Sequence, residues 1–229
     1  MKTHLLTPLL ALTLATATSQ ASLIPLTGGD PGEGFAPLPF TIAAVNLGSP
    51  VGFTVQGVNF AASSPNITFT APFAVETSYN PFAPTTANDS ALRAIGATQI
   101  FNVAPFTLTI SNLALGTLYQ VDSFIGGVTN TATEQVSALG LTPANDVVPL
   151  STAGVFYDVR QTLQPDATGK IVLTYSASSS VGAFSPFLNG ISVTSAAPPA
   201  VPEPGTALAG VIMAGLCGAM RRRRAAAAV

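Results

Sequence analysis

The stretch Phe106-Thr107-Leu108-Thr109-Ile110, FTLTI, alternates apolar and polar residues along its whole length. Successive side chains of a β-strand point to opposite faces, so this pattern is typical of a strand with one buried face and one accessible face. The same alternation predicts strands at residues 155–160 and 171–176. Longer apolar stretches complete the predicted set, at residues 51–60, 118–125 and 187–194.

Turn-forming residues separate the predicted strands, at Gly48-Ser49-Pro50, at Ser64-Pro65-Asn66, at Gly126-Gly127 and at residues 166–169. We predict one short helix, at residues 88–95, with Asn88 as its N-cap and Gly96 as its stop. Short strands, frequent turns and no recurring helix predict an all-β fold, an antiparallel β-sandwich. Among sandwiches we favour an eight-stranded jelly roll.

Residues 1–21 have the features of a secretory signal peptide. Lys2 supplies a positive charge, residues 5–15 form an apolar run, and Ser19 and Ala21 are the small residues that a cleavage site requires. A buried amphipathic helix is the alternative, but the run has no polar face. We therefore expect signal peptidase to cut between Ala21 and Ser22, leaving a β-sandwich domain of residues 22–194.

The exported part of the chain is acidic. Residues 22–200 carry nine acidic and three basic side chains, a net charge of −6. Nucleic-acid binding needs clustered Lys and Arg to neutralise phosphates, so this composition argues against a nucleic-acid partner. Nearly half of the whole chain, 48%, is hydrophobic, which is enough to build a core.

The same region lacks the residues that most catalytic and metal sites need. Its sequence contains no Trp, and the single His and single Cys of the chain, His4 and Cys217, lie in the terminal segments. Nucleophile systems that use His, and zinc or copper sites that use His or Cys, are therefore excluded from it. Carboxylate chemistry and oxygen-ligated ions such as Ca²⁺ remain.

The carboxyl-terminal segment contains, in sequence, the parts of a membrane-sorting signal. Val201-Pro202-Glu203-Pro204 precedes sixteen uncharged residues, 205–220, which would form a helix about 24 Å long. A short buried core helix is the alternative. The four arginines that follow are expensive to move through a bilayer, so we expect them to stop transfer and residues 225–229 to stay cytoplasmic. These arginines are Arg221, Arg222, Arg223 and Arg224.

This arrangement at residues 201–224 resembles the PEP-CTERM sorting signal of Gram-negative bacteria. The resemblance implies that an exosortase cuts near the Pro-Glu-Pro motif after the apolar helix has entered the membrane. It also implies release to, or attachment at, the cell surface, commonly alongside exopolysaccharide production. Prolines would keep the cleavage segment extended, and residues 195–200 are predicted to be a flexible linker.

Two stretches of the domain resemble known sandwich folds. Residues 113–121, LALGTLYQV, resemble a turn and strand of fibronectin-like and galactose-binding-like sandwiches. Residues 187–193, FLNGISV, resemble the final strand of malectin-like or galactose-binding-like jelly rolls. The jelly roll that these resemblances imply is of the galactose-binding-like type.

Four acids, Asp122, Glu134, Asp146 and Asp158, are spaced twelve residues apart. A glycoside hydrolase needs two carboxylates facing each other across a cleft, but twelve residues is also the length of a strand and a turn. We therefore predict one solvent-exposed acid per connection. We predict no cofactor; the best calcium candidate is Asp30 with Glu33, which supply few of the six to eight oxygens that Ca²⁺ takes.

Sugar binding would use an aromatic side chain with amides around it. The stretches Tyr79-Asn80-Pro81-Phe82 and Phe184-Ser185-Pro186-Phe187 are predicted loops that could supply one. The candidate ligand-binding residues are Tyr79, Asn80, Phe184 and Asn189. Most phenylalanines are predicted to be core residues, because Phe buries a large apolar area.

We therefore predict an exported, non-catalytic β-sandwich protein of the cell surface or extracellular matrix. Its expected partners are signal peptidase, an exosortase, the membrane before processing, and exopolysaccharide. A carbohydrate-binding module that interacts with exopolysaccharide is the alternative, and an enzyme that uses two acids is a weaker one.

Overall fold

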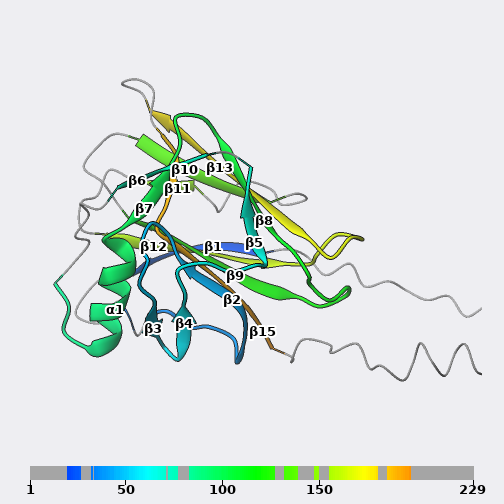
Figure 1. The fold of residues 1–229 in the computed structure, drawn as a ribbon, viewed down its shortest axis with the longest axis horizontal. Helices are drawn as coiled ribbons and strands as arrows, with labels where there is room; N and C mark the ends of the chain where they lie inside the picture. The colour runs from blue at the N-terminus through cyan, green and yellow to red at the C-terminus, as the bar shows by residue number, and fades with distance from the viewer. Residues whose placement is uncertain are drawn as a thin grey trace, which may run out of the picture. The chain divides into compact units, whose positions relative to one another are not determined.

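Two five-stranded antiparallel β-sheets form the framework of the described part of the chain (Figure 1). The structure, a computed structural model, describes residues 20–26, 32, 34–70, 72–76, 83–126, 132–138, 147–149, 155–179 and 185–196. The predicted sorting signal at 201–224, the predicted tail at 225–229, and all of the predicted signal peptide except Gln20 and Ala21 lie outside these residues. Only Ser195 and Ala196 of the predicted linker are described.

Sheet 1 contains the strands in the order β1-β12-β9-β15-β2. Each neighbouring pair is antiparallel, and the register runs without interruption except for a shift between Val193 and Thr194. The bounds are Gln20–Leu26 for β1, Phe156–Leu163 for β12, Tyr119–Gly126 for β9, Gly190–Ser195 for β15 and Phe40–Asn46 for β2.

Sheet 2 contains the strands in the order β11-β10-β13-β8-β5. The chain passes from one sheet to the other between β8 and β9, between β9 and β10, and between β12 and β13. The bounds are Val147–Pro149 for β11, Ala132–Ala138 for β10, Ile171–Ser179 for β13, Phe106–Ile110 for β8 and Ile67–Phe69 for β5.

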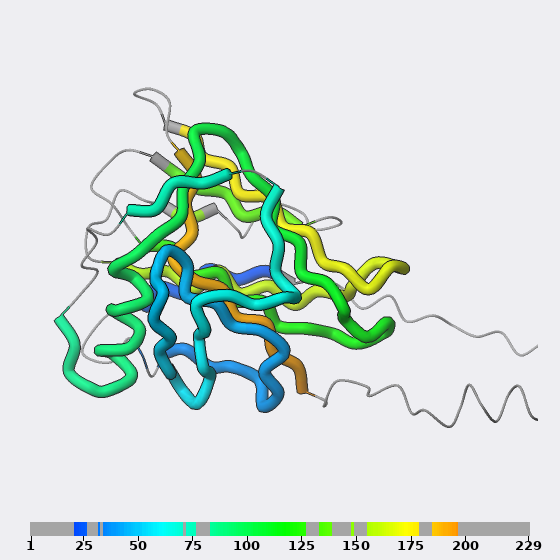
Figure 2. The backbone as a smooth tube through the Cα atoms, in the orientation of Figure 1, coloured from blue at the N-terminus to red at the C-terminus, as the bar shows by residue number. Residues whose placement is uncertain are grey.

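The main core lies between the two sheets. Val121 and Val159 of sheet 1 and Leu108 and Leu173 of sheet 2 belong to one buried apolar cluster. Burying each side chain of this size contributes about 1.5–3 kcal/mol. This shared core confirms the predicted all-β antiparallel sandwich, whereas its jelly-roll type stays a prediction. In Figure 2 both sheets contain segments from distant parts of the chain.

A hairpin occupies the position of one predicted strand. Residues 51–60 fold as β3 (Phe53–Val55) and β4 (Val58–Phe60), and not as a single strand. Gln56 and Gly57 between them both have positive φ, 49° and 78°, the conformation of a tight hairpin turn. The prediction was wrong because Gln is an uncommon residue for that conformation, so the sequence gives a weak turn signal.

A single α-helix, α1 (Ala87–Gly96), is found in the described part of the chain, close to the predicted range of 88–95. Its N-cap is Thr86 and not the predicted Asn88. Thr86 Oγ1 accepts a hydrogen bond from Asp89 N, and the Asp89 side chain accepts one from Thr86 N. Asn88 instead accepts a hydrogen bond from Gln56 N, which ties the helix to the β3–β4 turn.

Helix α1 and the hairpin cover the outer face of sheet 1. A second apolar cluster joins Leu92 and Ile95 of α1 to Phe60 of β4 and to Phe124 and Phe156 of sheet 1. The ring centroids of Phe124 and Phe156 lie 5.9 Å apart in a stacked arrangement. The centre of sheet 1 is therefore buried on both faces, and every residue of β9 is buried.

A third, smaller sheet lies beside helix α1. It contains β14 (Phe187–Leu188), β7 (Gln99–Phe101) and β6 (Ala74–Glu76), in that order. The predicted strand 187–194 is therefore divided at Asn189 between this small sheet and β15 of sheet 1.

Candidate functional site

Three of the four acids of the twelve-residue series are buried. Asp122, Glu134 and Asp158 have no exposed surface, so the prediction that they are solvent-exposed was wrong; Asp146 lies outside the described residues. Asp122 and Asp158 lie on the outer face of sheet 1. The segment at residues 36–38 crosses this face, where Leu38 N donates to Thr194 Oγ1 and Gln120 Nε2 donates to Ala36 O.

Arg160 joins the two aspartates. Its Nε donates to Asp122 Oδ1 at 2.8 Å, and its Nη2 donates to Asp158 Oδ2 at 2.7 Å. Gln120 Nε2 and Ser192 Oγ also donate to the Asp122 carboxylate. We call Asp122, Asp158 and Arg160 the acid–arginine cluster. Only Arg160 reaches solvent, with 20% of its side chain exposed.

This cluster sets two carboxyl groups against one guanidinium in a desolvated place. Burial raises the pKa of Asp158 well above its usual value, the Asp122 carboxylate adds to the increase, and Arg160 offsets only part of it. Burial alone would lower the pKa of Arg160, but Asp158 and Asp122 outweigh it and raise that pKa. Asp158 Oδ1 has no hydrogen-bond partner among the described residues. Two carboxylates without exposed surface are inaccessible to a polymeric substrate.

Glu134 lies inside the sandwich. Its Oε1 accepts a hydrogen bond from Phe187 N at 3.1 Å, and its Oε2 has no partner among the described residues. Burial raises the pKa of Glu134 well above its usual value. The nearby hydroxyls of Ser123 and Tyr175 bond each other across the core at 2.8 Å. Burial also raises the pKa of Tyr175.

Asn189, a predicted ligand-binding residue, is fully buried. Its Oδ1 accepts a hydrogen bond from Gly126 N at 2.8 Å, and its Nδ2 donates to Gly96 O and Thr98 O at 3.1 and 2.8 Å. The side chain therefore ties sheet 1 to the end of α1. Both polar atoms of the Asn189 side chain are hydrogen-bonded to the backbone. Asn189 therefore has a structural role in packing, which corrects the prediction that it binds a ligand.

The other predicted ligand-binding residues, Tyr79, Asn80 and Phe184, lie outside the described residues. The small sheet shows where their segments attach. Its register aligns Glu76, the end of β6, with Gln99, and Phe187, the start of β14, with Phe101. The described residues at the ends of the two segments, Glu76 and Phe187, therefore pair with opposite ends of β7.

The predicted calcium residues Asp30 and Glu33 also lie outside the described residues. Gly32, between them, donates its N–H to Asp89 Oδ1 at 2.7 Å. A Cβ on Gly32 would lie 2.4 Å from the Asn88 carbonyl carbon, so this segment packs closely on the helix. Among the described residues, no group of three or more His, Cys, Asp or Glu side chains is placed to hold a metal ion.

An accessible groove opens between the edge strands β2 and β5. It has a volume of about 250 Å³, and Val45, Leu47, Ile67 and Ile100 belong to both its lining and the buried core. We call this the edge groove. The remaining lining residues are Gly48, Ala62, Ser63, Ser64, Phe69 and Phe73.

Two aromatic rings form one side of the edge groove. The ring centroids of Phe69 and Phe73 lie 5.1 Å apart with an interplanar angle of 70°, and Phe73 is 41% exposed. Ser63, also exposed, contributes a hydroxyl. Apolar surface with a few polar groups is the usual composition of a small-ligand site. Sequence analysis missed this site because a phenylalanine that lines a groove has no pattern that separates it from a core phenylalanine.

None of the described helices is long and apolar enough to span a membrane. The predicted membrane helix at residues 205–220 lies outside the described part of the chain.

No protein-family model and no curated protein matches this chain. Solved structures match over 67% of it. A calcium-binding mutant of β-glucuronidase 2 from Bacteroides uniformis has 15% identity and a TM-score of 0.51, with 18% of that chain covered. The ANX1 ectodomain from Arabidopsis thaliana has 16% identity and a TM-score of 0.50, with 41% covered. The plant receptor-like kinase ANX2 has 12% identity and a TM-score of 0.52, with 47% covered. The chain thus spans less than half of each, and these likenesses concern the fold alone.

Proposed function

We propose that this chain is an exported, non-catalytic β-sandwich protein that is displayed at, or released from, the cell surface of a Gram-negative bacterium. The observation that supports the non-catalytic part is the burial of Asp122, Glu134 and Asp158. The carboxylates that a two-acid mechanism would use are held in the interior by backbone and arginine donors. They therefore serve the packing of the domain.

The proposed route depends on the two ends of the chain. Signal peptidase would cut between Ala21 and Ser22 while the domain crosses the inner membrane. The apolar segment 205–220 would then anchor the protein, with Arg221–Arg224 on the cytoplasmic side, until an exosortase cuts near Pro202-Glu203-Pro204. Seven-residue strand β1 begins at Gln20, so five of its residues, 22–26, remain in the mature domain.

Mass spectrometry of both ends of the surface-exposed protein tests this route. We expect a mature amino terminus at Ser22 and a mature carboxyl terminus near Glu203–Pro204 in cells that contain exosortase. Intact peptides from residues 205–229 in the surface-exposed protein would contradict the sorting proposal.

A second function, binding of exopolysaccharide, is favoured by the edge groove. An exposed phenylalanine ring supported by a second ring offers a flat apolar surface to the C–H face of a sugar, and the serine hydroxyl offers a hydrogen bond. The site contains no charged side chain in its lining, so an uncharged saccharide segment is the ligand that fits best.

Binding of the native protein to exopolysaccharide from the producing cells tests this second function. Phe73→Ser removes the exposed ring, and we expect it to weaken binding about tenfold or more, the effect of losing about 1.4 kcal/mol or more. Val103→Ser is the control, because Val103 is 84% exposed and lies outside the groove lining. Equal binding by both variants would contradict a saccharide site in the edge groove.

A further inference from the structure

The chain enters and leaves the sandwich at the same end. The register of sheet 1 places Leu163, Tyr119, Ser195 and Phe40 in one row across β12, β9, β15 and β2. Gln20, the first residue of β1, pairs with Thr162 in the adjacent row. The segments before β1 and after β15 are therefore attached to one end of sheet 1, which we call the terminal end.

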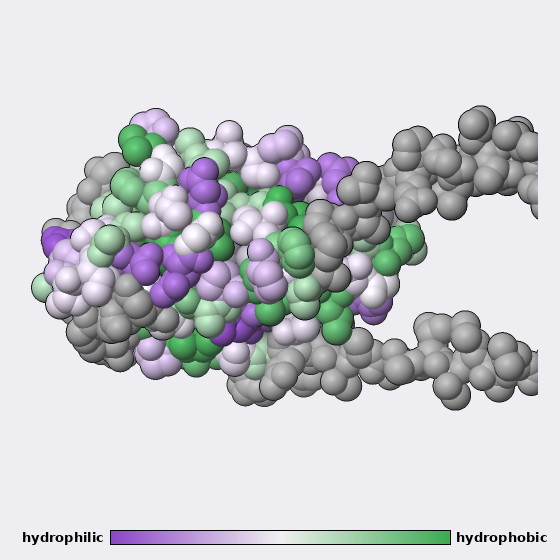
Figure 3. Space-filling view, turned by 90° about the horizontal axis from the view of Figure 1, so that it is seen from below, coloured by the Kyte–Doolittle hydropathy of each residue, from purple (hydrophilic) through white to green (hydrophobic). Residues whose placement is uncertain are grey.

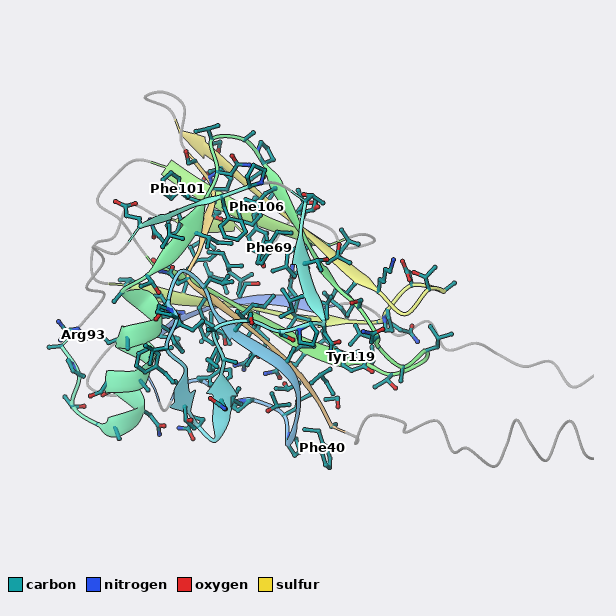
Figure 4. The ribbon with its side chains drawn as sticks, viewed as in Figure 1. Phe40, Phe69, Arg93, Phe101, Phe106 and Tyr119 are labelled. Atoms are coloured by element: carbon teal, nitrogen blue, oxygen red, sulfur yellow. The ribbon has the colours of Figure 1, made fainter. Side chains whose placement is uncertain are left out.

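Two loops belong to the terminal end as well. Residues 111–118 connect β8 to β9, and residues 164–170 connect β12 to β13. Leu113 N donates to Gly169 O at 3.0 Å, which joins the two loops. Ala114 N donates to Tyr119 Oη at 2.8 Å, which fixes the first loop to sheet 1. In Figure 4 Tyr119 and Phe40 are labelled in the same part of sheet 1, and Phe40 points away from it.

Large apolar side chains are exposed around the terminal end. Leu115 is 63% exposed, Leu118 is 41% exposed and Phe40 is 38% exposed. Leu115 occupies the tip of a turn, before Gly116 at φ 76°, where Thr117 N donates to Ala114 O. Turn tips usually carry Asn, Asp, Ser, Gly or Pro, so a leucine there is unusual. Apolar side chains also reach the surface elsewhere among hydrophilic ones (Figure 3).

The charges at this end do not explain the exposed side chains. In the described loops 111–118 and 164–170, the charged residues are Asp166 and Lys170, which have opposite signs. The loop containing them is closed by Asp166 Oδ1, which accepts hydrogen bonds from Thr168 N and Lys170 N. An apolar partner fits this end better than a strongly charged one.

The length of chain that follows β15 favours a lipid surface as that partner. Eight residues, 197–204, separate Ala196 from the apolar segment 205–220. Fully extended, they span at most about 29 Å. With the apolar segment in a bilayer, the terminal end stays within that distance of lipid. A tether of this kind gives the terminal end an effective concentration of about a millimolar at the lipid surface. Three apolar side chains are then sufficient for lipid contact, even where they would bind lipid weakly without the tether.

We propose that Phe40, Leu115 and Leu118 insert into the interfacial layer of the phospholipid bilayer while the carboxyl-terminal segment is still in the membrane. This inference rests on the proposed sorting function. The domain then stands on the membrane with its terminal end against the lipid.

The chain contains no Trp, so single tryptophans report on this contact without background. Leu115→Trp places the probe at the terminal end. Val103→Trp is the matched control, because it lies in the connection before β8 whereas Leu115 lies in the one after it. Protein from cells without exosortase is reconstituted in vesicles of phosphatidylethanolamine and phosphatidylglycerol, with and without brominated acyl chains. Both variants are first checked for native circular dichroism.

We expect brominated lipid to reduce the emission of Leu115→Trp by about twofold or more and to leave that of Val103→Trp nearly unchanged. If the protein resists a carbonate wash but brominated lipid changes the emission of Leu115→Trp and Val103→Trp equally, this inference is overturned and the sorting proposal is left intact. Loss of the protein from the vesicles in the wash would overturn both. Replacing Phe40 and Leu118 with Ser should abolish the quenching of Leu115→Trp, and quenching that survives both changes would contradict a shared patch.

Discussion

The two sheets of the sandwich bury their strands in different ways. In sheet 2, β8 alternates buried and half-buried residues, and in β13 the buried Ile171, Leu173 and Tyr175 alternate with accessible residues. In sheet 1, all eight residues of β9 are buried, because α1, the β3–β4 hairpin and residues 36–38 cover the outer face. Polar side chains on the outer face of sheet 2 are solvated, whereas those of sheet 1 must be hydrogen-bonded internally.

The largest difference between the sheets is expected at Arg160. Arg160→Met leaves Asp122 and Asp158 buried without their cation, and removing one partner of a buried ion pair costs about 3–5 kcal/mol. Val172→Thr on the outer face of sheet 2 should change the free energy of unfolding by less than about 0.5 kcal/mol. Urea denaturation of the native protein measures both. Similar losses in the free energy of unfolding for Arg160→Met and Val172→Thr would contradict the difference proposed between the outer faces of the two sheets.

Asn189 gives the second test, where the covering layer meets sheet 1. Asn189→Ala removes three hydrogen bonds and leaves Gly126 N, Gly96 O and Thr98 O without that partner. We expect a loss of about 2–4 kcal/mol in the free energy of unfolding. Asn59→Ala on the exposed side of β4 is the control and should have little effect. An Asn189→Ala protein as stable as the control would show that the covering layer does not depend on this side chain.

The third test concerns Asp89 in the covering layer itself. Burial alone would raise the pKa of Asp89, but hydrogen bonds from Gly32 and from Thr85 and Thr86 outweigh it and lower that pKa. Its contribution to stability is therefore present above about pH 4 and lost as the pH falls through the lowered value. Asp89→Ala should cost about 2 kcal/mol at pH 7 and progressively less in acid. If Asp89→Ala lowers the free energy of unfolding equally at pH 7 and pH 2, a lowered pKa of Asp89 is contradicted.

Glu134 in the sandwich core should show the opposite pH dependence. Its folded-state pKa is raised, so the folded protein binds this proton more tightly than the unfolded chain. Stability is lost as the pH rises from about 4.3 towards the raised value, by up to about 1.4 kcal/mol per pH unit. Glu134→Gln should remove that loss, which urea denaturation at pH 5, 6 and 7 detects. Parallel pH profiles for both proteins would contradict a raised pKa at this position.

Sequence pattern predicts the buried and accessible faces of β8 and β13 in sheet 2 but not the burial of the acids in sheet 1, for a physical reason. The alternation in β8 and β13 reflects one core face and one solvated face, which neighbouring residues reveal. The burial of Asp122 and Asp158 depends on α1, the hairpin and residues 36–38, which lie far from them in the chain. The spacing of the acids contains no information about that cover, so a solvated surface was the natural prediction.

The helix and the candidate site show the same limit. The helix was predicted because turn and capping residues bound it, but Thr86 and Asn88 are both good caps. Their roles are assigned only by contacts in the fold, those of Thr86 with Asp89 and of Asn88 with Gln56. The edge groove was missed because its lining brings residues 45–48 together with residues 62–73 and Ile100, which are far apart in the chain. The sorting signal at 201–224 stays a prediction from sequence.

The most direct test of the claim that the sheet 1 acids are structural is a double-mutant cycle. The change in unfolding free energy caused by Arg160→Met is measured in the native protein and in one that carries Asp122→Asn and Asp158→Asn. We predict that most of the cost of about 3–5 kcal/mol disappears when both carboxylates are neutral amides. An equal cost in the two backgrounds would contradict the claim, because Arg160 would then stabilise the fold independently of the acids.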